Sequence, residues 1–328
     1  MDNQNKPKVS ILMPTFNVEK YVNEAVSSIL NQTYNNIELI IVDDCSTDGT
    51  FAILQKLALT DSRILLAKNE ENMKICATLN KAWRMSTGEY IARMDGDDVS
   101  EPQRLEILMH FIEEHPNVDL VGSQVISIDE EGSILSYKQY LRSSKYIDKG
   151  NRIAPCVSHI WLAKRKVYDE LKGYRNIPFV EDYDFLLRGQ ARGFNYANVD
   201  EYLYRVRIRQ GNTGSTNGLP QRKAKFFVQN INSSSVRESN IAEQYEKAIS
   251  CSEDESREYS KAHDDLEIAI HSRKKPWRLL YFTIKAMIES KYVRSYLIDS
   301  LKIRSLLWKE NMEMPRKPVI ENEGNKAR

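Results

Sequence analysis

Cysteine is scarce in this sequence, and the four cysteines lie far apart. Cys45, Cys76, Cys156 and Cys251 form no C-x-x-C pair and no dense cluster. They therefore indicate neither a disulfide framework nor a zinc site, both of which need closely spaced cysteines. We interpret them as reduced thiols of a cytosolic protein.

An excess of charge of either sign is also absent. The chain carries 47 Lys and Arg residues against 46 Asp and Glu residues, which gives a net charge of +1. A protein that wraps nucleic acid needs a strongly basic surface. We therefore expect no nucleic-acid partner, and any charged ligand must bind a local patch.

Long apolar runs are missing as well. No stretch approaches the ~20 uninterrupted apolar residues that a membrane-spanning helix needs. Residues 1–8 are mostly polar and lead directly into a short apolar run, so we expect no secretory signal. With 328 residues, 41% of them hydrophobic, the chain can nevertheless bury a large core.

Apolar runs and helical periodicity alternate between Lys8 and Gly122. We expect strands at residues 9–13, 37–42, 63–67, 90–94 and 118–122. The segments between them place apolar residues at helical spacing, as in Val22, Val26 and Ile29. This alternation predicts an α/β fold with a mostly parallel central sheet and helices on both faces.

The rest of the chain has a different pattern. In residues 123–218 we expect strands near 125–128 and 133–140 and a helix near 182–192. After Leu219 the pattern is helical, acidic over residues 241–271 and then basic and aromatic over residues 273–309. We predict one domain over residues 1–218, with two halves that meet near residue 122, and a helical extension over residues 219–328.

Three carboxylates follow the expected strand at residues 90–94. Asp95, Asp97 and Asp98 lie within four residues, where each negative charge opposes the ionisation of its neighbours. A divalent cation removes this repulsion, and hard oxygen ligands suit Mg²⁺ or Mn²⁺ bound to a diphosphate. The alternative is a loop whose aspartates cap the helix that begins near Ser100, although one aspartate is sufficient for a cap.

Two further acidic motifs also have local explanations. Asp43 and Asp44 end the second expected strand, where a carboxylate can accept hydrogen bonds from a nucleobase or a ribose. The neighbouring hydroxyl and acidic residues can equally cap the next helix. The acidic run at residues 181–184 opens a helix, where the helix dipole favours negative charge, or it supplies a general base.

Five motifs, in the same order along the chain, strongly resemble those of bacterial family 2 glycosyltransferases. They are residues 9–17 together with Glu19-Lys20-Tyr21, Gln32-Thr33-Tyr34, residues 42–50, residues 88–98 and Glu181-Asp182. The resemblance covers about residues 8–215. It implies a GT-A fold, inverting transfer of a sugar in a single displacement, and Mn²⁺ or Mg²⁺ as cofactor.

The resemblance assigns roles to the matching positions. The residues implied to bind the nucleotide sugar, a UDP-sugar, are Pro14, Thr15, Phe16, Asn17, Glu19, Asp43, Asp44, Asp95 and Gly96. Asp97 would bind the metal ion, and Asp182 would deprotonate the acceptor hydroxyl. Residues 8–122 would form the donor half of the catalytic domain, and residues 123–218 the acceptor half.

One element departs from the family pattern. Many relatives carry Tyr-Arg-x-His near the end of the catalytic domain, whereas this chain has arginines at Arg205, Arg207 and Arg209. Arginine offers no lone pair to a metal, but it can clamp a diphosphate; the alternative is one solvated strand face. His159 and Glu181 are further candidates for contacts to the diphosphate or the acceptor, and an ordinary polar contact is the alternative for His159.

Basic and aromatic residues are interleaved after residue 273. Val293, Leu297, Leu301 and Trp308 align on one helical face, so one hypothesis is a basic amphipathic helix that lies on anionic lipid. The other hypothesis is a helical appendage that packs on the catalytic domain. The resemblance favours the membrane, because the expected acceptors of such enzymes are lipid-linked sugars.

The resemblance implies a cytoplasmic enzyme, peripheral on the inner face of the cytoplasmic membrane. It would transfer a hexose or N-acetylhexosamine to an acceptor linked to undecaprenyl diphosphate or lipid A, in O-antigen, capsule or lipooligosaccharide biosynthesis. One alternative is a catalytically silent homologue that acts as a scaffold or binding subunit. Another is a nucleotidyltransferase, which would carry a glycine-rich or basic phosphate cradle that residues 13–17 lack.

Overall fold

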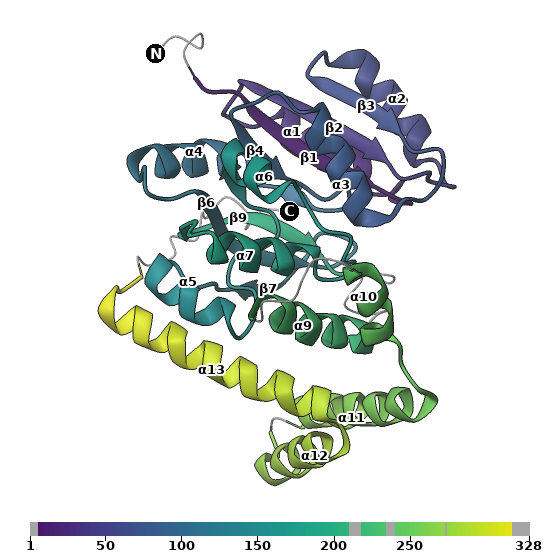
Figure 1. The fold of residues 1–328 in the computed structure, drawn as a ribbon, viewed down its shortest axis with the longest axis vertical. Helices are drawn as coiled ribbons and strands as arrows, with labels where there is room; N and C mark the ends of the chain where they lie inside the picture. Colours follow the sequence, from purple (N-terminus) through teal and green to yellow (C-terminus); the bar gives the residue numbers. More distant parts are fainter. Residues whose placement is uncertain (1–5, 210–217, 234–239, 273, 317–328) are drawn as a thin grey trace.

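The computed structural model describes residues 6–209, 218–233, 240–272 and 274–316. Its N-terminal part is a layer of parallel strands with helices between them (Figure 1). In chain order the elements are β1 (Val9–Thr15), α1 (Val22–Leu30), β2 (Ile37–Asp43), α2 (Thr50–Thr60), β3 (Ile64–Lys68), α3 (Lys74–Met85) and β4 (Tyr90–Arg93). β1 pairs in parallel with β2 and β4, and β2 pairs in parallel with β3, as predicted.

The second part adds strands that run in both directions. Its elements are β5 (Val99–Ser100), α4 (Arg104–Glu114), β6 (Leu120–Ile128), β7 (Ile134–Lys138), α5 (Ser144–Asn151), β8 (Leu162–Lys164), α6 (Arg165–Leu171), α7 (Glu181–Ala191) and β9 (Tyr196–Arg207). β8 is antiparallel to β4 and β6, whereas β9 is parallel to β6. The strands of the described residues form one nine-stranded sheet in the order β3-β2-β1-β4-β8-β6-β9-β5, with β7 paired to β6.

The strands expected at residues 118–122 and 125–128 are one strand, β6. The polar residues Ser123 and Gln124 suggest a break in the sequence, but both are fully buried. The side chain of Gln124 donates to the carbonyl oxygen of Val199 at 2.7 Å and accepts from the N–H of Tyr140 at 2.6 Å. A polar side chain with such partners can remain inside a sheet, so the strand continues.

The core lies on both faces of the sheet. Ile11 and Met13 of β1 pack in one apolar cluster with Val26 of α1, whereas Leu12 packs in a second cluster with Leu79 of α3. β1 and β2 are buried along their whole length. Strands that are covered by helices on both faces carry such continuous apolar runs, which confirms the predicted layers.

The carboxyl ends of three strands meet at one edge of the sheet. β1, β2 and β4 are parallel and end at Thr15, Asp43 and Arg93, respectively. The strand order reverses between β1 and β4, because the chain adds β2 on one side of β1 and β4 on the other. Ligands of open α/β sheets bind beyond the carboxyl ends of strands at such a point.

The chain continues as a series of helices, which confirms the predicted helical C-terminal region. They are α9 (Gly218–Ser233), α10 (Ile241–Ile249), α11 (Glu253–His271), α12 (Pro276–Glu289) and α13 (Lys291–Glu313). The long α13 runs back past α9 toward α5 (Figure 1). Among the described residues, no helix combines the length and the apolar character needed to cross a membrane.

The apolar face expected on α13 is divided between two environments. Val293 is 4% exposed and packs with Leu297 against α11 and α12, whereas Leu301 and Trp308 are 65% and 64% exposed. Four residues that align on one helical face thus do not form one exposed surface, because α11 and α12 cover only the first turns of α13. Packing on other helices, the second hypothesis from the sequence, therefore applies to Val293 and Leu297, and the four residues do not face lipid together.

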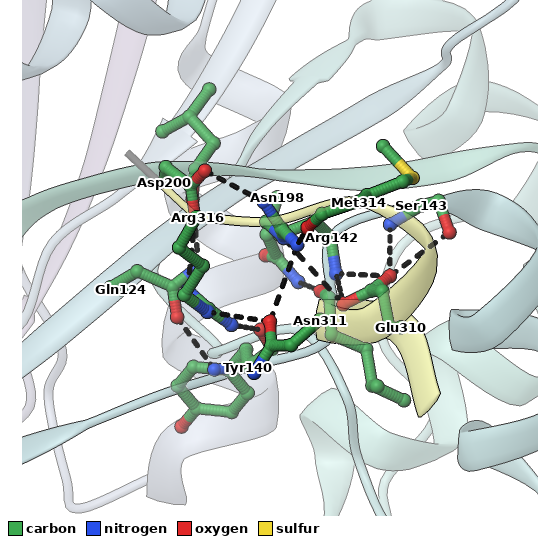
Figure 2. Close-up of polar contacts among 12 residues, drawn as sticks. Gln124, Tyr140, Arg142, Ser143, Asn198, Asp200, Glu310, Asn311, Met314 and Arg316 are labelled. Carbon is green, nitrogen blue, oxygen red and sulfur yellow. Dashed lines mark hydrogen bonds and ion pairs between the residues drawn. The ribbon is translucent and has the colours of Figure 1, made fainter. Parts of the chain in front are cut away.

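The end of α13 is bound to the sheet through buried charges (Figure 2). Glu310 is fully buried and accepts hydrogen bonds from the N–H groups of Arg142 and Ser143, at 3.0 and 2.9 Å. The guanidinium groups of Arg142 and Arg316 both bind Asp200, at 2.8 and 3.0 Å. The end of α13 therefore packs on the acceptor half predicted from the sequence.

Candidate active site

Two loops at the carboxyl edge of the sheet are joined through Asn17. This residue adopts a left-handed backbone conformation with φ 51°, which asparagine tolerates better than most residues. Its N–H donates to the hydroxyl of Ser46 at 3.0 Å, and its side-chain oxygen accepts from the N–H of Thr47 at 2.8 Å. These bonds hold the loop after β1 against the loop after β2, and Phe16 beside them is 43% exposed.

Three of the predicted donor-site carboxylates bind the backbone of the chain itself. Asp43 is fully buried and accepts from the Thr15 hydroxyl at 3.3 Å and the Ser46 N–H at 3.0 Å. Asp44 accepts from the first N–H of α3 at 2.9 Å, and Glu19 accepts from the N–H immediately before α2 at 2.6 Å. These hydrogen bonds fix the shape of the loops. Those of Asp44 and Glu19 lie at helix N-termini, where carboxylates are favoured.

Gly96 lets the acidic loop at residues 95–98 approach β1 closely. A Cβ atom at this position would lie 2.8 Å from Cγ2 of Thr15 and 3.4 Å from the carbonyl oxygen of Pro14. The first distance is too short for two carbon atoms, so a larger residue would push the loop away. The structure thus brings Gly96 together with Pro14 and Thr15, all three predicted to bind the donor.

Asp95 follows β4 and binds two basic side chains. Its Oδ1 atom lies 3.3 Å from Nε of Arg93, and its Oδ2 atom lies 2.9 Å from Nε2 of His159. Burial alone raises the pKa of this carboxyl, but Arg93 and His159 outweigh burial and hold the pKa well below its ordinary value. Asp95 therefore stays an anion at neutral pH.

Asp97 and Asp98 are less easily ionised. Burial, followed by the charges of Asp97 and Asp95, raises the pKa of Asp98 well above its ordinary value. Burial and the charge of Asp95 also raise the pKa of Asp97, which pairs with Arg209 at 2.7 Å between Oδ2 and Nε. Carboxylates that oppose each other's ionisation in this way favour an added cation.

Asp95, Asp98 and His159 form a group that could hold a divalent metal ion. One ligand atom of each residue lies within 4.8 Å of the others. Carboxylates suit Mg²⁺ and Mn²⁺, and imidazole is a common ligand of divalent transition metals, so the donor set fits a divalent ion. His159 joins this group, whereas Asp97 faces Arg209, and its role as metal ligand stays a prediction.

Arg93 is a site residue that the sequence did not single out. It is 4% exposed, and its Nη1 atom lies 3.0 Å from Oε1 of Glu181 while Nε contacts Asp95. Burial alone would lower the pKa of this guanidinium, but the two carboxylates raise it well above its ordinary value. The available signal in the sequence is an arginine at the end of an apolar strand, directly before three aspartates.

Asp182 lies in the first turn of α7, next to Glu181. Its Oδ1 atom accepts from the adjacent N–H of Tyr183 at 2.7 Å, and its side chain is partly exposed. Glu181 is 8% exposed and turns toward Arg93, and burial raises the pKa of its carboxyl. Through Arg93 the start of α7 is tied to the acidic loop, a connection that a capping role alone does not require.

Sequence comparisons identify the family. The profile described as Glycosyl transferase family 2 matches residues 10–172. EpsE of Bacillus subtilis (strain 168), which carries the name of a glycosyltransferase, is 38% identical over 218 residues, or 61% of this chain and 73% of EpsE. The chain belongs to glycosyl transferase family 2. WcaA of Escherichia coli (strain K12), named a colanic acid biosynthesis glycosyl transferase, is 31% identical over 233 residues, or 68% of this chain and 80% of WcaA.

Solved structures share the fold of this family 2 glycosyltransferase. S. aureus TarS 1-349 in complex with UDP-GlcNAc has a TM-score of 0.56 at 18% identity, covering 84% of this chain and 90% of that one. The mannosyltransferase PcManGT from Pyrobaculum calidifontis, in complex with GDP-Man and Mn²⁺, has a TM-score of 0.57 at 16% identity, covering 95% and 89%. These similarities confirm the predicted GT-A fold.

In this glycosyltransferase the three arginines near the end of β9 have different surroundings. Arg207 is 2% exposed and donates to the carbonyl oxygen of Asp97 at 2.9 Å. Arg205 pairs with Glu101 at 2.5 Å. The three side chains therefore do not form one solvated strand face, and Arg209 is the arginine whose guanidinium pairs with a carboxylate of the acidic loop.

Two more buried residues support the acidic loop of the glycosyltransferase. The hydroxyl of Tyr204, a fully buried residue, accepts from the N–H of Asp95 at 3.1 Å. Arg104 is also fully buried, donates to the carbonyl oxygen of Arg93 at 2.8 Å and lies 4.9 Å from the centre of the Tyr204 ring. Burial lowers the pKa of Arg104 to about 10. The sequence pattern does not separate Arg104 from arginines on exposed helix faces.

Proposed function

We propose that this enzyme transfers a hexose or N-acetylhexosamine from a UDP-sugar to a saccharide acceptor, with inversion at the anomeric carbon. The observation that carries the proposal is the group of Asp95, Asp98 and His159, within 4.8 Å of one another at the carboxyl edge of the sheet. TarS and PcManGT, which share the fold, hold UDP-GlcNAc and GDP-Man. Both complexes support a nucleotide-sugar donor, and the choice of uridine is what the resemblance of the sequence motifs to the family implies.

The donor would bind where the loops after β1, β2 and β4 meet. The proposed contacts come from Pro14, Thr15, Phe16, Asn17, Glu19, Asp43, Asp44, Asp95 and Gly96. The exposed ring of Phe16 offers an aromatic face to a nucleobase. In addition to these proposed contacts, Glu19, Asp43 and Asp44 hold the loop backbone, because each carboxylate binds a backbone N–H of the chain.

The implied metal ion, Mn²⁺ or Mg²⁺, would bind to Asp97 and to the group of Asp95, Asp98 and His159. When bound, it would act as a Lewis acid on the diphosphate of the donor and hold it in place. Arg209 lies beside Asp97 and adds a guanidinium suited to a phosphate oxygen. Arg205 and Arg207 support the loop through Glu101 and the Asp97 backbone.

Asp182 is the proposed general base. It takes the proton of the acceptor hydroxyl, whose oxygen then forms a bond to the anomeric carbon on the face opposite the diphosphate. The bond between that carbon and the diphosphate oxygen breaks, and UDP leaves with the electron pair. Arg93 and Glu181 position Asp182, because they tie the first turn of α7 to the acidic loop.

The acceptor is proposed to be a saccharide linked to undecaprenyl diphosphate or lipid A, in O-antigen, capsule or lipooligosaccharide biosynthesis. The naming of WcaA for colanic acid and of TuaG of Bacillus subtilis for teichuronic acid supports a role in polysaccharide synthesis. In this proposal residues 1–218 form the catalytic domain. The basic region after residue 273 holds the enzyme on the inner face of the cytoplasmic membrane.

A donor screen tests the proposed reaction. Purified protein with Mn²⁺ is given UDP-glucose, UDP-galactose, UDP-GlcNAc, UDP-GalNAc or GDP-mannose, and release of the nucleotide by slow transfer of the sugar to water is measured. We expect release from at least one UDP-sugar, lost when EDTA is added. Release from GDP-mannose alone, or from none of the five donors, would contradict the proposal.

A further inference from the structure

Helix α12 presents an apolar stripe to solvent. Its members are Trp277, Leu280, Tyr281, Ile284 and Ile288, with exposures from 47% to 73%. They occupy positions i, i+3, i+4, i+7 and i+11 and therefore share one helical face. Isolated exposed apolar residues are ordinary, but a continuous stripe of large ones indicates a contact surface.

The opposite face of α12 is held by the helices beside it. Ala286 is fully buried in a cluster with Ala262 of α11 and Val293 of α13. Lys285 donates to Asp265 of α11 at 2.9 Å. The stripe is thus the outer face of a helix that is fixed on its inner side.

The charges on and before α12 are mostly positive. Residues 274–289 contain four cations, Lys274, Lys275, Arg278 and Lys285, against the single carboxylate Glu289. Glu289 lies 2.7 Å from Lys261 and 4.0 Å from Lys285. The stripe itself carries no carboxylate, and the exposed Lys274 and Lys275 lie directly ahead of it.

We propose that the α12 stripe is the surface through which this enzyme binds a bilayer that contains anionic lipid. The proposal deepens the membrane association proposed above and does not depend on the transfer chemistry. Trp277 and Tyr281 combine an apolar ring with a polar N–H or O–H group, which suits the interface between acyl chains and headgroups. The positive charges of Lys274 and Lys275 would contact the negatively charged lipid headgroups.

A second copy of the chain is the main competing occupant. A helix of 14 residues is about 21 Å long. One face of it offers a small area compared with the roughly 1,200–2,000 Å² that a stable protein interface buries. A lipid surface needs no such area, because binding grows with each inserted side chain. The cationic residues ahead of the stripe would also repel the same residues of a second copy brought close to them.

Helix α13 connects this surface to the catalytic part of the protein. Its first turns pack on α11 and α12, and its far end is bound through Glu310 to Arg142 and Ser143 (Figure 2). On the helical face of α13 that carries the exposed Leu301 and Trp308, the positions between them are the polar Arg304 and Ser305, so these two side chains form no continuous apolar stripe. We therefore assign lipid contact to α12, and α13 sets its position relative to the active site.

Vesicle flotation of the full-length protein tests the proposal. The probe is vesicles of phosphatidylcholine with phosphatidylglycerol, compared with phosphatidylcholine alone. The protein is expected to float with the anionic vesicles, and the double variant Trp277→Ser/Ile288→Ser to lose on the order of tenfold in partitioning. Lys274→Glu/Lys275→Glu is expected to reduce the preference for anionic vesicles. Trp308→Ser and Leu59→Ser, a residue 88% exposed on α2, serve as matched controls and should float like the wild type.

Three results would overturn the assignment to α12. The first is wild-type protein that stays in the soluble fraction, and the second is a Trp277→Ser/Ile288→Ser variant that floats normally. The third is a wild-type dimer, detected by light scattering, that becomes a monomer when these two substitutions are made. Nucleotide release from the donor, measured without vesicles, should be equal in all variants. Loss of that release in the wild type would instead count against the proposed function.

Discussion

The guanidinium of Arg93 and the carboxylate of Glu181 lie 3.0 Å apart, although 88 residues separate them in the sequence. The pair joins the end of β4 to the start of α7, and the same guanidinium contacts Asp95. A buried cation between two carboxylates fixes both segments, because displacing either one leaves a buried charge without its partner. The acidic loop and the proposed base are thereby held as one unit.

Arg93→Gln should therefore damage both stability and transfer. Removal of the guanidinium leaves the buried Glu181 carboxylate without its cation and takes one of two basic partners from Asp95, which we expect to lower the free energy of unfolding by about 3 kcal/mol. Arg93→Lys keeps a cation and should restore part of the loss in kcat. Urea unfolding and steady-state kinetics measure the two effects.

The matched control for Arg93 is Arg63→Gln. Arg63 pairs with Asp61 at 2.8 Å, but both side chains are partly exposed. An exposed pair contributes about 0–1 kcal/mol, so this variant should unfold almost like the wild type. Equal effects of the Arg93 and Arg63 substitutions would contradict the positioning role.

Asp182→Asn tests the general base. The amide cannot take the acceptor proton, so we expect transfer to fall by about 10²–10⁴-fold. Donor affinity should persist, because no donor contact is proposed for Asp182. Calorimetry with UDP and initial-rate measurements separate the two quantities. Glu170→Gln, at an exposed position on α6, is the control; a normal rate for Asp182→Asn would remove the residue from the base role.

Substitutions in the acidic loop test the metal site. His159→Ala removes one of the three grouped ligand atoms, and we expect Mn²⁺ affinity to fall on the order of tenfold or more. Asp97→Ala should abolish metal-dependent turnover. Electron paramagnetic resonance of free Mn²⁺ gives the affinities directly. Unchanged Mn²⁺ binding in both variants would place the ion elsewhere.

Glu38 gives a pH dependence that is independent of the active site. Burial alone raises the pKa of its carboxyl, but hydrogen bonds from Ser10 and Thr87 and the charge of Lys8 hold it below the ordinary value. Its stabilisation is therefore present above the unfolded pKa of about 4.3 and is lost as pH falls through the folded pKa.

Glu38→Gln should accordingly cost about 2 kcal/mol of stability at neutral pH. The difference from the wild type should shrink as the pH falls below about 4.3. Urea unfolding at a series of pH values measures it, with Glu71→Gln, at an exposed position, as the control. A difference that stays constant down to pH values near 3 would show that the Glu38 charge does not contribute.

Glu310→Gln tests the anchor of α13. The substitution breaks a fully buried charge contact with Arg142 and should destabilise the protein by about 3 kcal/mol. Hydrogen exchange in α13 should become faster before exchange in β1 does. Glu313→Gln, whose side chain is 53% exposed, should have little effect. Equal protection of α13 in both variants would argue against the anchor.

Much of the sheet could be predicted from the sequence, because the spacing of apolar residues indicates which side chains are buried. The fully apolar runs of β1 and β2 and the amphipathic spacing of α1 identify their environments directly. Periodicity failed at β6, where Gln124 is polar but satisfies its hydrogen bonds inside the sheet. It also failed on α13, where Val293 and Trp308 share a helical face but have different neighbours.

Motif spacing located the carboxylates of the site but not their partners. Asp95 and Asp98 are visible as a cluster in the sequence, whereas His159 reaches them only through the folding of a segment about 60 residues later. The pairing of Arg93 with Glu181 is a tertiary contact of the same kind. Such contacts depend on where loops meet in space, and no local pattern in a single sequence encodes that.

A calorimetric titration tests whether the carboxyl edge of the sheet is the donor site. UDP is added to folded wild-type protein in the presence of Mn²⁺, and the experiment is repeated after EDTA. We expect saturable binding with Mn²⁺ and an affinity at least about tenfold weaker without it. A folded sample that binds neither Mn²⁺ nor UDP would contradict the assignment of this edge of the sheet as the donor site.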